Sequence, residues 1–245
     1  MSGTVLVEKN DGIATVTLSN PGKRNAIDHA MAVALVRTCE ELDADASVGA
    51  VLLCGAEGYF CSGGDRKLLA AAGERPAAPA EFAAMTDVYN SFRRVGDLRA
   101  PTIAAIRGGA VGAGLNLALA TDLRIVAEDA VLMSGFMRIG LHPGGGNGHL
   151  LRQTAGSEAA AALTLFGERI DGVRAVQLGL AWEAPGDAEV ESRARELAAI
   201  PAADPEVAWR TAKSLRAQGD KHARWDLALD YERSSQMWTM ARKHH

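Results

Sequence analysis

A glycine-rich turn between two apolar segments has the residue types that bind an anion. It runs from Gly108 to Gly114, after Pro101–Ile106, a predicted buried strand, and before Leu115–Ala120, a predicted helix. Glycine lacks a Cβ, so a ligand can approach the backbone closely, and a helix start presents free N–H groups and the positive end of its dipole. The spacing fits neither a phosphate loop nor a dinucleotide-binding turn. The segment therefore predicts either a site for an anion or developing oxyanion, or close helix packing without a ligand.

A second glycine turn favours the site over simple packing. Tyr59–Lys67 contains the pair Gly63-Gly64 and follows another predicted buried strand, Ala50–Gly55. Two N–H groups, one from each turn, would form a two-donor hole for a carbonyl oxygen. A thioester is the expected partner, because its oxygen becomes negative when the acyl group enolises.

Four motifs in this order resemble the crotonase (enoyl-CoA hydratase/isomerase) superfamily over nearly the whole chain. They correspond to the opening hairpin and coenzyme A turn, the first oxyanion loop, the second loop with its helix, and the segment after the third active-site position. In this sequence the four are Ile13–Ile27, Phe60–Asp65, Pro101–Asp122 and Ile139–Gly146.

The resemblance implies a fold, an assembly and a substrate class. The fold would be α/β, a crotonase (ClpP-like) spiral of strand-strand-helix units with an all-helical C-terminal segment. Trimers, often paired into hexamers, are usual in the family, and coenzyme A enters as part of the substrate, with no permanently bound cofactor. The oxyanion donors would be the N–H groups of Gly64 and Ala113. The residues expected to contact coenzyme A are Lys23, Arg24, Ala26, Ser62, Gly64 and Lys67, although these cations could also be ordinary solvated surface charges.

Two departures from the family bear on the reaction. Hydratases use two glutamates to position and activate water, and here these positions hold Asn116 and Phe136. An amide cannot act as a general base near neutral pH, and a phenyl ring cannot transfer a proton. The leading hypothesis is therefore an acyl-CoA enzyme of the lyase/isomerase type whose exact reaction is open. The alternative is a non-catalytic acyl-CoA binding or carrier protein.

Three other side chains on the matched loops could transfer protons or line the pocket, and each has a structural alternative. Asp65 is either a proton-transfer group or a helix cap. His142 has the pKa range for transfer at neutral pH, but it could simply bond a neighbouring backbone carbonyl. Arg138 would line the substrate pocket beside Phe136, or form a structural salt bridge. Asn116 could bond a substrate group without transferring a proton.

Composition bears on the possible binding partners, on disulfide bonds and on the cellular location. The 245 residues carry a net charge of −4, which argues against nucleic acid, and 48% are hydrophobic, as in ordinary globular proteins. The three cysteines have no metal-binding spacing, and their odd number argues against a disulfide framework. Neither a signal segment nor an apolar run of membrane-spanning length is apparent, so we expect a cytoplasmic protein.

Hydrophobic periodicity predicts alternating strands and helices up to about Gly144 and helices only beyond it. We expect a spiral core over residues 1–160 with the coenzyme A and oxyanion loops, and a helical trimerisation segment over residues 161–245. The stretch Leu68–Ala80 is expected to be a mobile flap or a variable surface loop. Further helices are predicted over 28–42, 80–95, 149–155, 158–166, 172–178, 188–200, 205–217 and 222–240.

Overall fold

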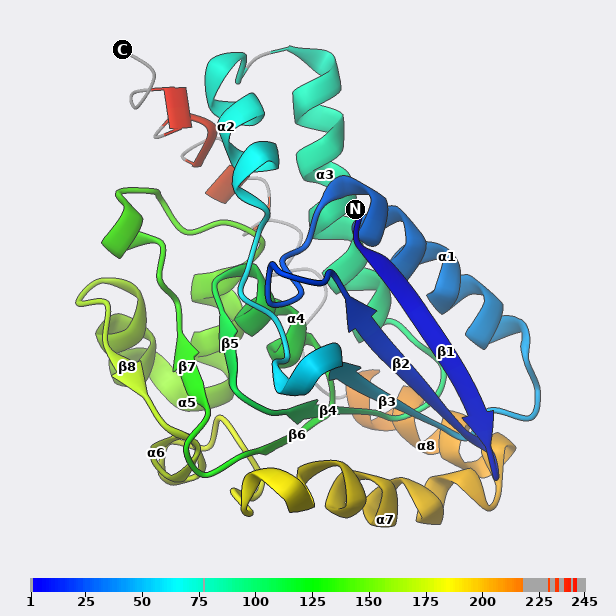
Figure 1. Ribbon diagram of the computed structural model, residues 1–245. Helices are drawn as coiled ribbons and strands as arrows, with labels where there is room; N and C mark the ends of the chain where they lie inside the picture. Colours follow the sequence, from blue (N-terminus) through cyan, green and yellow to red (C-terminus); the bar gives the residue numbers. More distant parts are fainter. Residues whose placement is uncertain are drawn as a thin grey trace.

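A five-stranded sheet forms the base of the structure (Figure 1). The computed structural model describes residues 2–76 and 78–217, with Leu229, Glu232, Arg233, Gln236–Trp238, Met240 and Ala241. The strand order is β1-β2-β3-β4-β6; β1 and β2 are antiparallel and the others pair in parallel. The strands are β1 (Thr4–Asn10), β2 (Ile13–Ser19), β3 (Ala50–Gly55), β4 (Thr102–Ile106) and β6 (Leu123–Val126). The predicted opening hairpin is thus confirmed.

A second, smaller sheet has the order β5-β7-β8. Its strands are β5 (Gly109–Val111), β7 (Val131–Met133) and β8 (Arg169–Ile170). Strands β4 and β6 of the larger sheet are each followed directly by a strand of the smaller sheet and then by a helix. The chain therefore repeats a strand-strand-helix unit, as predicted.

The helices surround the two sheets. Helix α3 packs between α1 and α4, α4 also contacts α5, and α7 lies along four strands of the larger sheet (Figure 1). The helices are α1 (His29–Ala44), α2 (Arg66–Glu74), α3 (Pro79–Gly96), α4 (Ala113–Ala120), α5 (Asn147–Thr164), α6 (Gly172–Gln177), α7 (Val190–Ala202) and α8 (Pro205–Ala217). The helix expected over residues 222–240 lies mostly outside the described residues, although those described are helical.

The structure corrects two sequence predictions. The stretch expected to be a flap or loop after Asp65 forms helix α2, because the Asp65 side chain caps it by accepting from the N–H of Lys67, and alanine and leucine then favour the helix. The C-terminal part is helical as predicted except for β8, whose two residues pair with β7. A two-residue strand is too short to show any periodicity.

Small residues let the segments pack closely. At Gly114 an added Cβ would lie against the carbonyl oxygen of Cys61 and 2.8 Å from its Cβ. Cys39, Cys54 and Cys61 are all buried in the core. None of the helices that the structure describes is both long and apolar enough to cross a membrane.

Candidate active site

The two glycine turns lie side by side at the carboxyl ends of β3 and β4. A parallel bridge joins Cys61 to Ala110: the Cys61 N–H donates to the Gly109 carbonyl at 3.1 Å, and the Val111 N–H donates to the Cys61 carbonyl at 3.0 Å. Because β3 and β4 are parallel, the segments that follow them emerge at the same edge of the sheet. The sequence prediction that these turns meet is therefore confirmed.

Backbone pairing leaves the N–H groups of Gly64 and Ala113 unused by the described residues. A bridge to Ile27 uses the Gly63 carbonyl and the Asp65 N–H, each at 2.8 Å, and skips the N–H of Gly64 between them. Ala113 is the first residue of α4, where no intrahelical acceptor exists. Within residues 2–76 and 78–217, neither of the two N–H groups donates to a protein atom.

Two glycines in unusual conformations shape these turns. Gly63 has φ +108 and Gly112 has φ +54, values that side-chain-bearing residues rarely adopt. A Cβ built on Gly63 would lie 3.8 Å from the Ala113 nitrogen, which shows how closely the first turn approaches the start of α4. Leu69 of α2 lies over Gly64, 3.6 Å from where its Cβ would be. The first glycine turn thus lies between the start of α4, at Ala113, and Leu69 of α2.

The turn before α1 is attached to the first glycine loop. The Ser62 N–H donates to the Arg24 carbonyl at 2.9 Å, and its hydroxyl donates to the Lys23 carbonyl at 2.8 Å. The structure therefore brings Lys23, Arg24 and Ser62 to one place, as the resemblance implied. Arg24 is exposed and lies over the Tyr59 ring at 5.4 Å, Lys67 is exposed on α2, and Ala26 is buried.

Asp65 is 5% exposed and has a complete set of partners. Its carboxylate accepts from the Lys67 N–H at 2.9 Å and pairs with the Lys23 ammonium at 2.7 Å. Burial acts to raise the Asp65 pKa, but the Lys23 ammonium and the N–H groups at the start of α2 outweigh it, so the pKa lies below its ordinary value. The capping alternative is confirmed, and a carboxylate held ionised in this way is a poor proton donor.

Asn116 lies fully buried beneath the second turn. Its Nδ2 donates to the Gly144 carbonyl at 2.7 Å, and its Oδ1 accepts from Asn147 Nδ2 at 2.8 Å. The Asn147 Oδ1 in turn accepts from the hydroxyl of Ser134 at 2.8 Å. Both ends of the Asn116 amide are therefore bonded to protein, in a buried network that joins α4 to the start of α5.

Phe136 lies beside the second glycine turn, whereas Arg138 bonds the segment that follows α5. A Cβ on Gly112 would be 3.9 Å from the Phe136 ring, so this ring forms an apolar wall beside the start of α4. Arg138 is exposed, and its Nε donates to the Gly167 carbonyl at 2.8 Å, beyond the end of α5. The structure thus places Phe136 next to the candidate hole and turns Arg138 toward the end of α5.

His142 has a backbone partner at one ring nitrogen, and the Cys61 thiol is held protonated. His142 is half-buried, and its Nδ1 lies 2.7 Å from the Pro143 carbonyl, which is the backbone contact given as its structural alternative. Complete burial raises the pKa of the Cys61 thiol to about 12, so this thiol is not a nucleophile at neutral pH. The described residues contain no group of three or more metal-binding side chains.

Sequence reasoning missed Glu232, whose carboxylate reaches the start of α5. It accepts from the N–H groups of Gly146 at 2.9 Å, Asn147 at 3.1 Å and Gly148 at 3.2 Å. About 85 positions separate the partners, and no local pattern in the sequence signals such a contact.

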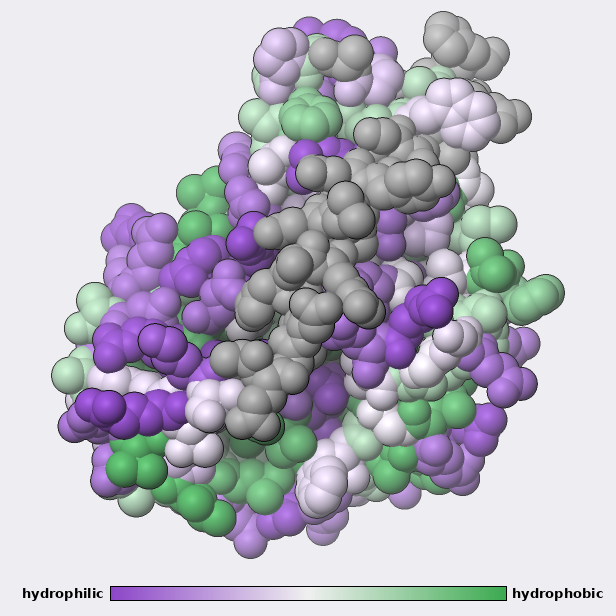
Figure 2. Space-filling model, turned by 180° about the vertical axis from the view of Figure 1, so that it is seen from behind, coloured by the Kyte–Doolittle hydropathy of each residue, from purple (hydrophilic) through white to green (hydrophobic). Residues whose placement is uncertain are grey.

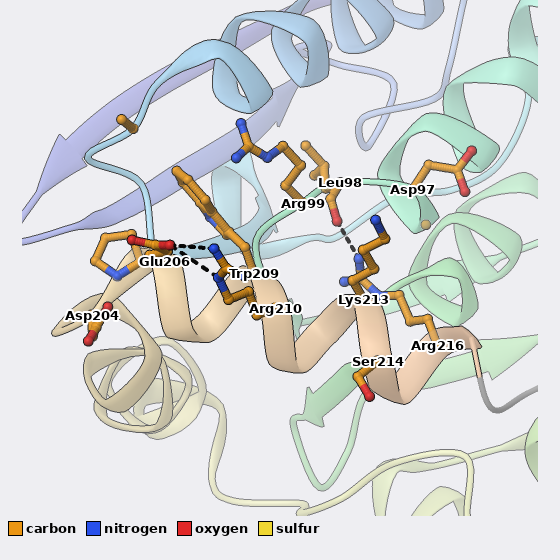
Figure 3. Close-up of a pocket in the computed structure, with 13 residues that line it drawn as sticks. Asp97, Leu98, Arg99, Asp204, Glu206, Trp209, Arg210, Lys213, Ser214 and Arg216 are labelled. Atoms are coloured by element: carbon orange, nitrogen blue, oxygen red, sulfur yellow. Dashed lines mark hydrogen bonds and ion pairs between the residues drawn. The ribbon is translucent and has the colours of Figure 1, made fainter.

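An open cavity of about 1240 Å³ lies away from the glycine turns (Figure 3). Its lining residues precede β3 and β4 or belong to α8, so it lies at the opposite edge of the sheet from the two turns. Arg99 stacks on Trp209 at 3.9 Å, and Arg210 pairs with Glu206 at 2.7 Å. Because the two turns carry the matched motifs and the cavity lies at the other edge of the sheet, we place the candidate site at the turns.

Comparisons with known proteins identify the family and the fold. Residues 8–242 match the family described as enoyl-CoA hydratase/isomerase. A protein described as a probable enoyl-CoA hydratase of Mycobacterium tuberculosis is 39% identical over 214 residues, 87% of this chain and 81% of that protein. The 1,2-epoxyphenylacetyl-CoA isomerase of Escherichia coli is 31% identical over 235 residues, 95% of this chain and 88% of that one. Among crystal structures, an enoyl-CoA hydratase from Polaromonas has a TM-score of 0.82 at 27% identity, covering 94% of this chain and 90% of that chain.

Proposed function

Because the chain belongs to the enoyl-CoA hydratase/isomerase family and has the crotonase fold, we propose that it binds an acyl-CoA thioester and polarises the thioester carbonyl between the N–H groups of Gly64 and Ala113. The observation that carries the proposal is the pair of neighbouring N–H groups that the described residues leave without an acceptor. A donor aimed at a developing oxyanion contributes a few kcal/mol of transition-state stabilisation in comparable sites.

The coenzyme A part of the substrate would lie on the turn before α1 and the start of α2. Lys23, Arg24 and Lys67 are exposed there and supply positive charge for its phosphates. Ser62 fixes this turn against the first oxyanion loop through its two hydrogen bonds. Phe136 would form one wall for the acyl group.

We propose that the step following polarisation of the thioester carbonyl is not the efficient addition of water that ordinary hydratases perform. Asn116 is bonded at both ends and Phe136 is apolar, while the Asp65 carboxylate has a lowered pKa and is already paired with Lys23, so it is only a weak base. Loss of a general base costs about 10²–10⁴ in rate. We expect crotonyl-CoA hydration to be slow, and turnover tests across enoyl-, malonyl- and aryl-CoA thioesters would distinguish an enzyme of another subtype from a non-catalytic acyl-CoA binder.

The site assignment is testable by removing each donor with proline. Gly64→Pro eliminates one N–H, and Ala113→Pro eliminates the other at a first helical position, where proline is well tolerated. We expect each to weaken binding of butyryl-CoA in calorimetry and, with any thioester that turns over, to lower kcat by about 10²–10³. Gly64→Ala is the matched control, because it keeps the N–H and its Cβ would meet Leu69 at an ordinary 3.6 Å.

Folded proline variants that bind butyryl-CoA as the natural protein does would exclude this site. If neither natural protein nor control binds any acyl-CoA, the function itself is excluded.

We also propose a trimer, or a dimer of trimers, in the cytoplasm. Hydrophobic side chains gather at the edge of the molecule where 137–139 and the end of α5 lie (Figure 2). These exposed residues are Met137, Ile139, Leu165 and Phe166. Contiguous exposed apolar surface of this kind commonly marks a subunit interface.

A further inference from the structure

Glu232 brings a buried carboxylate to the start of α5 from the far end of the chain. Glu232 is only 8% exposed. Its two carboxylate oxygens accept hydrogen bonds from the N–H groups of Gly146, Asn147 and Gly148. These first N–H groups of a helix have no intrahelical partners, and the positive end of the helix dipole favours an anion there. The carboxylate thus serves as a cap supplied by a distant segment.

Gln236, four positions after Glu232, contacts the segment that leads into α5 at its other end, near His142. Its Nε2 donates to the His142 carbonyl at 3.2 Å, and its Oε1 accepts from the Tyr89 hydroxyl of α3. Gly144 leaves the space for this contact, because a Cβ there would overlap the Gln236 carboxamide. Glu232 and Gln236 together therefore contact both ends of the segment 142–148.

The held segment connects directly to the proposed oxyanion donor. The N–H of Asn147 bonds Glu232, while its side chain bonds Asn116 at 2.8 Å. Asn116 donates to the Gly144 carbonyl, and its own N–H donates to the carbonyl of Gly112, the residue before Ala113. A displacement of the start of α5 would therefore be transmitted through the buried amides to the turn that carries the Ala113 N–H.

Burial and hydrogen bonding act in opposite directions on the pKa of Glu232. Burial raises the Glu232 pKa to about 7, although the three backbone N–H groups act in the opposite direction. Burial and the nearby Glu232 charge also raise the pKa of Tyr89, whereas Arg233 acts to lower it. The site is built around a carboxylate, so a neutral amide should substitute for it poorly.

We propose that Glu232 is a positioning residue: it fixes segment 142–148 and thereby the oxyanion turn at Ala113. The proposal rests on the function proposed above and adds a contribution from the C-terminal part of the chain. Glu232 does not touch the substrate in this scheme; it acts through Asn147 and Asn116.

Hydrogen exchange tests the clamp without any substrate. In Glu232→Gln an NH₂ group replaces one acceptor oxygen, so at least one of the three backbone N–H groups loses its partner. We expect amides 146–148 to exchange about tenfold faster. The second variant, Gln236→Leu, leaves Glu232 intact and should release the His142 end alone. Glu206→Gln is the matched control, because Glu206 forms an exposed pair with Arg210 on α8.

Carbonyl polarisation tests the link to the site. We would bind butyryl-CoA carrying ¹³C at its carbonyl and measure the carbonyl chemical shift, which reports hydrogen bonding to that oxygen. The natural protein and Glu206→Gln should shift the signal downfield, and Glu232→Gln should lose much of that shift while its affinity falls less than tenfold. A merely structural role would lower stability but leave the shift of the folded, bound fraction unchanged.

The outcomes separate the two proposals. Unchanged exchange at residues 146–148 in Glu232→Gln, or faster exchange with an unchanged carbonyl shift, overturns the positioning role and leaves the proposed function standing. Absence of a carbonyl shift in the natural protein overturns the proposed function, and the positioning role with it. Should Glu232→Gln fail to fold, Glu232→Asp decides the question, because its side chain is one methylene shorter and cannot reach all three N–H groups. The same shift loss would support the role, and a natural shift would overturn it.

Discussion

Asp65 links residue-scale electrostatics to the stability of the first oxyanion loop. Its pKa lies below its ordinary value in the folded protein, so its stabilising contribution is present above the unfolded pKa, near 4, and is lost as the pH falls through the lowered folded pKa. Asp65→Asn retains a capping side chain but loses the charge that pairs with Lys23. We expect this variant to unfold at lower urea than the natural protein at pH 7, with the gap narrowing as the pH falls below about 4.

Asp129→Asn provides the control for this measurement, because Asp129 is exposed on the turn before β7. It should change the urea midpoint little at either pH. A gap for Asp65→Asn that stays the same from pH 7 to pH 3 would show that the Asp65 charge does not stabilise the fold.

The Asn116 amide should contribute to stability through both of its ends. Asn116→Ala leaves the Gly144 carbonyl and the Asn147 Nδ2 without this partner, and each unpaired buried group costs about 1–3 kcal/mol. We expect the free energy of unfolding to fall by about 2–4 kcal/mol, measured in urea. Asn90→Ala on the exposed surface of α3 should change it by less than about 0.5 kcal/mol. Equal stability of Asn116→Ala and the natural protein would contradict the network.

At the scale of elements, the sequence predicted those strands and helices whose own residues carry a clear signal. The opening hairpin, the buried strands β3 and β4 and most helices have clear periodicity or caps, and the structure confirms them. Helix α2 was misread because the alanine, glycine and proline of residues 68–80 suggested a loop, whereas the deciding signal was the Asp65 cap. The short strands β5 and β8 depend on pairing with β7, which no local pattern reveals.

Gly114 is the element-scale contact on which both oxyanion loops depend. Gly114→Ala would push a methyl group against the Cys61 backbone and 2.9 Å from its Sγ, so the two loops would have to separate. We expect a loss of about 1–3 kcal/mol in unfolding free energy and weaker butyryl-CoA binding in calorimetry. Gly64→Ala, which meets only ordinary contacts, should retain both properties. Normal stability and affinity in Gly114→Ala would show that the loops do not need this close approach.

At the scale of the whole molecule, the two glycine turns meet because the parallel strands β3 and β4 present their carboxyl ends at one edge of the sheet. The family resemblance, and no local pattern, implied that the turn at Lys23 and the two glycine turns belong to one site, and the structure joins these three segments by hydrogen bonds. Sequence reasoning could not find Glu232, since a contact between residue 232 and residues 146–148 arises only from how the C-terminal segment packs back on the core. The Asn116–Asn147 bond joins separate helices and was hidden for the same reason.

The proposed trimer gives the last prediction, at the apolar edge formed by Met137, Ile139, Leu165 and Phe166. Their exposed fractions of 51%, 51%, 62% and 78% are large for apolar side chains, and the Arg138–Gly167 hydrogen bond holds the two segments together. Phe166→Asp would place a charge in the middle of this surface, and an unpaired charge is costly to bury in an interface. We expect sedimentation velocity to show trimers or hexamers for the natural protein and smaller species for Phe166→Asp. Ile200→Asp is the matched control: Ile200 is 80% exposed on α7, outside this edge, and its variant should sediment like the natural protein. If Phe166→Asp assembles as the natural protein does, the edge is not the subunit interface, and a natural protein that sediments as a monomer would exclude the trimer itself.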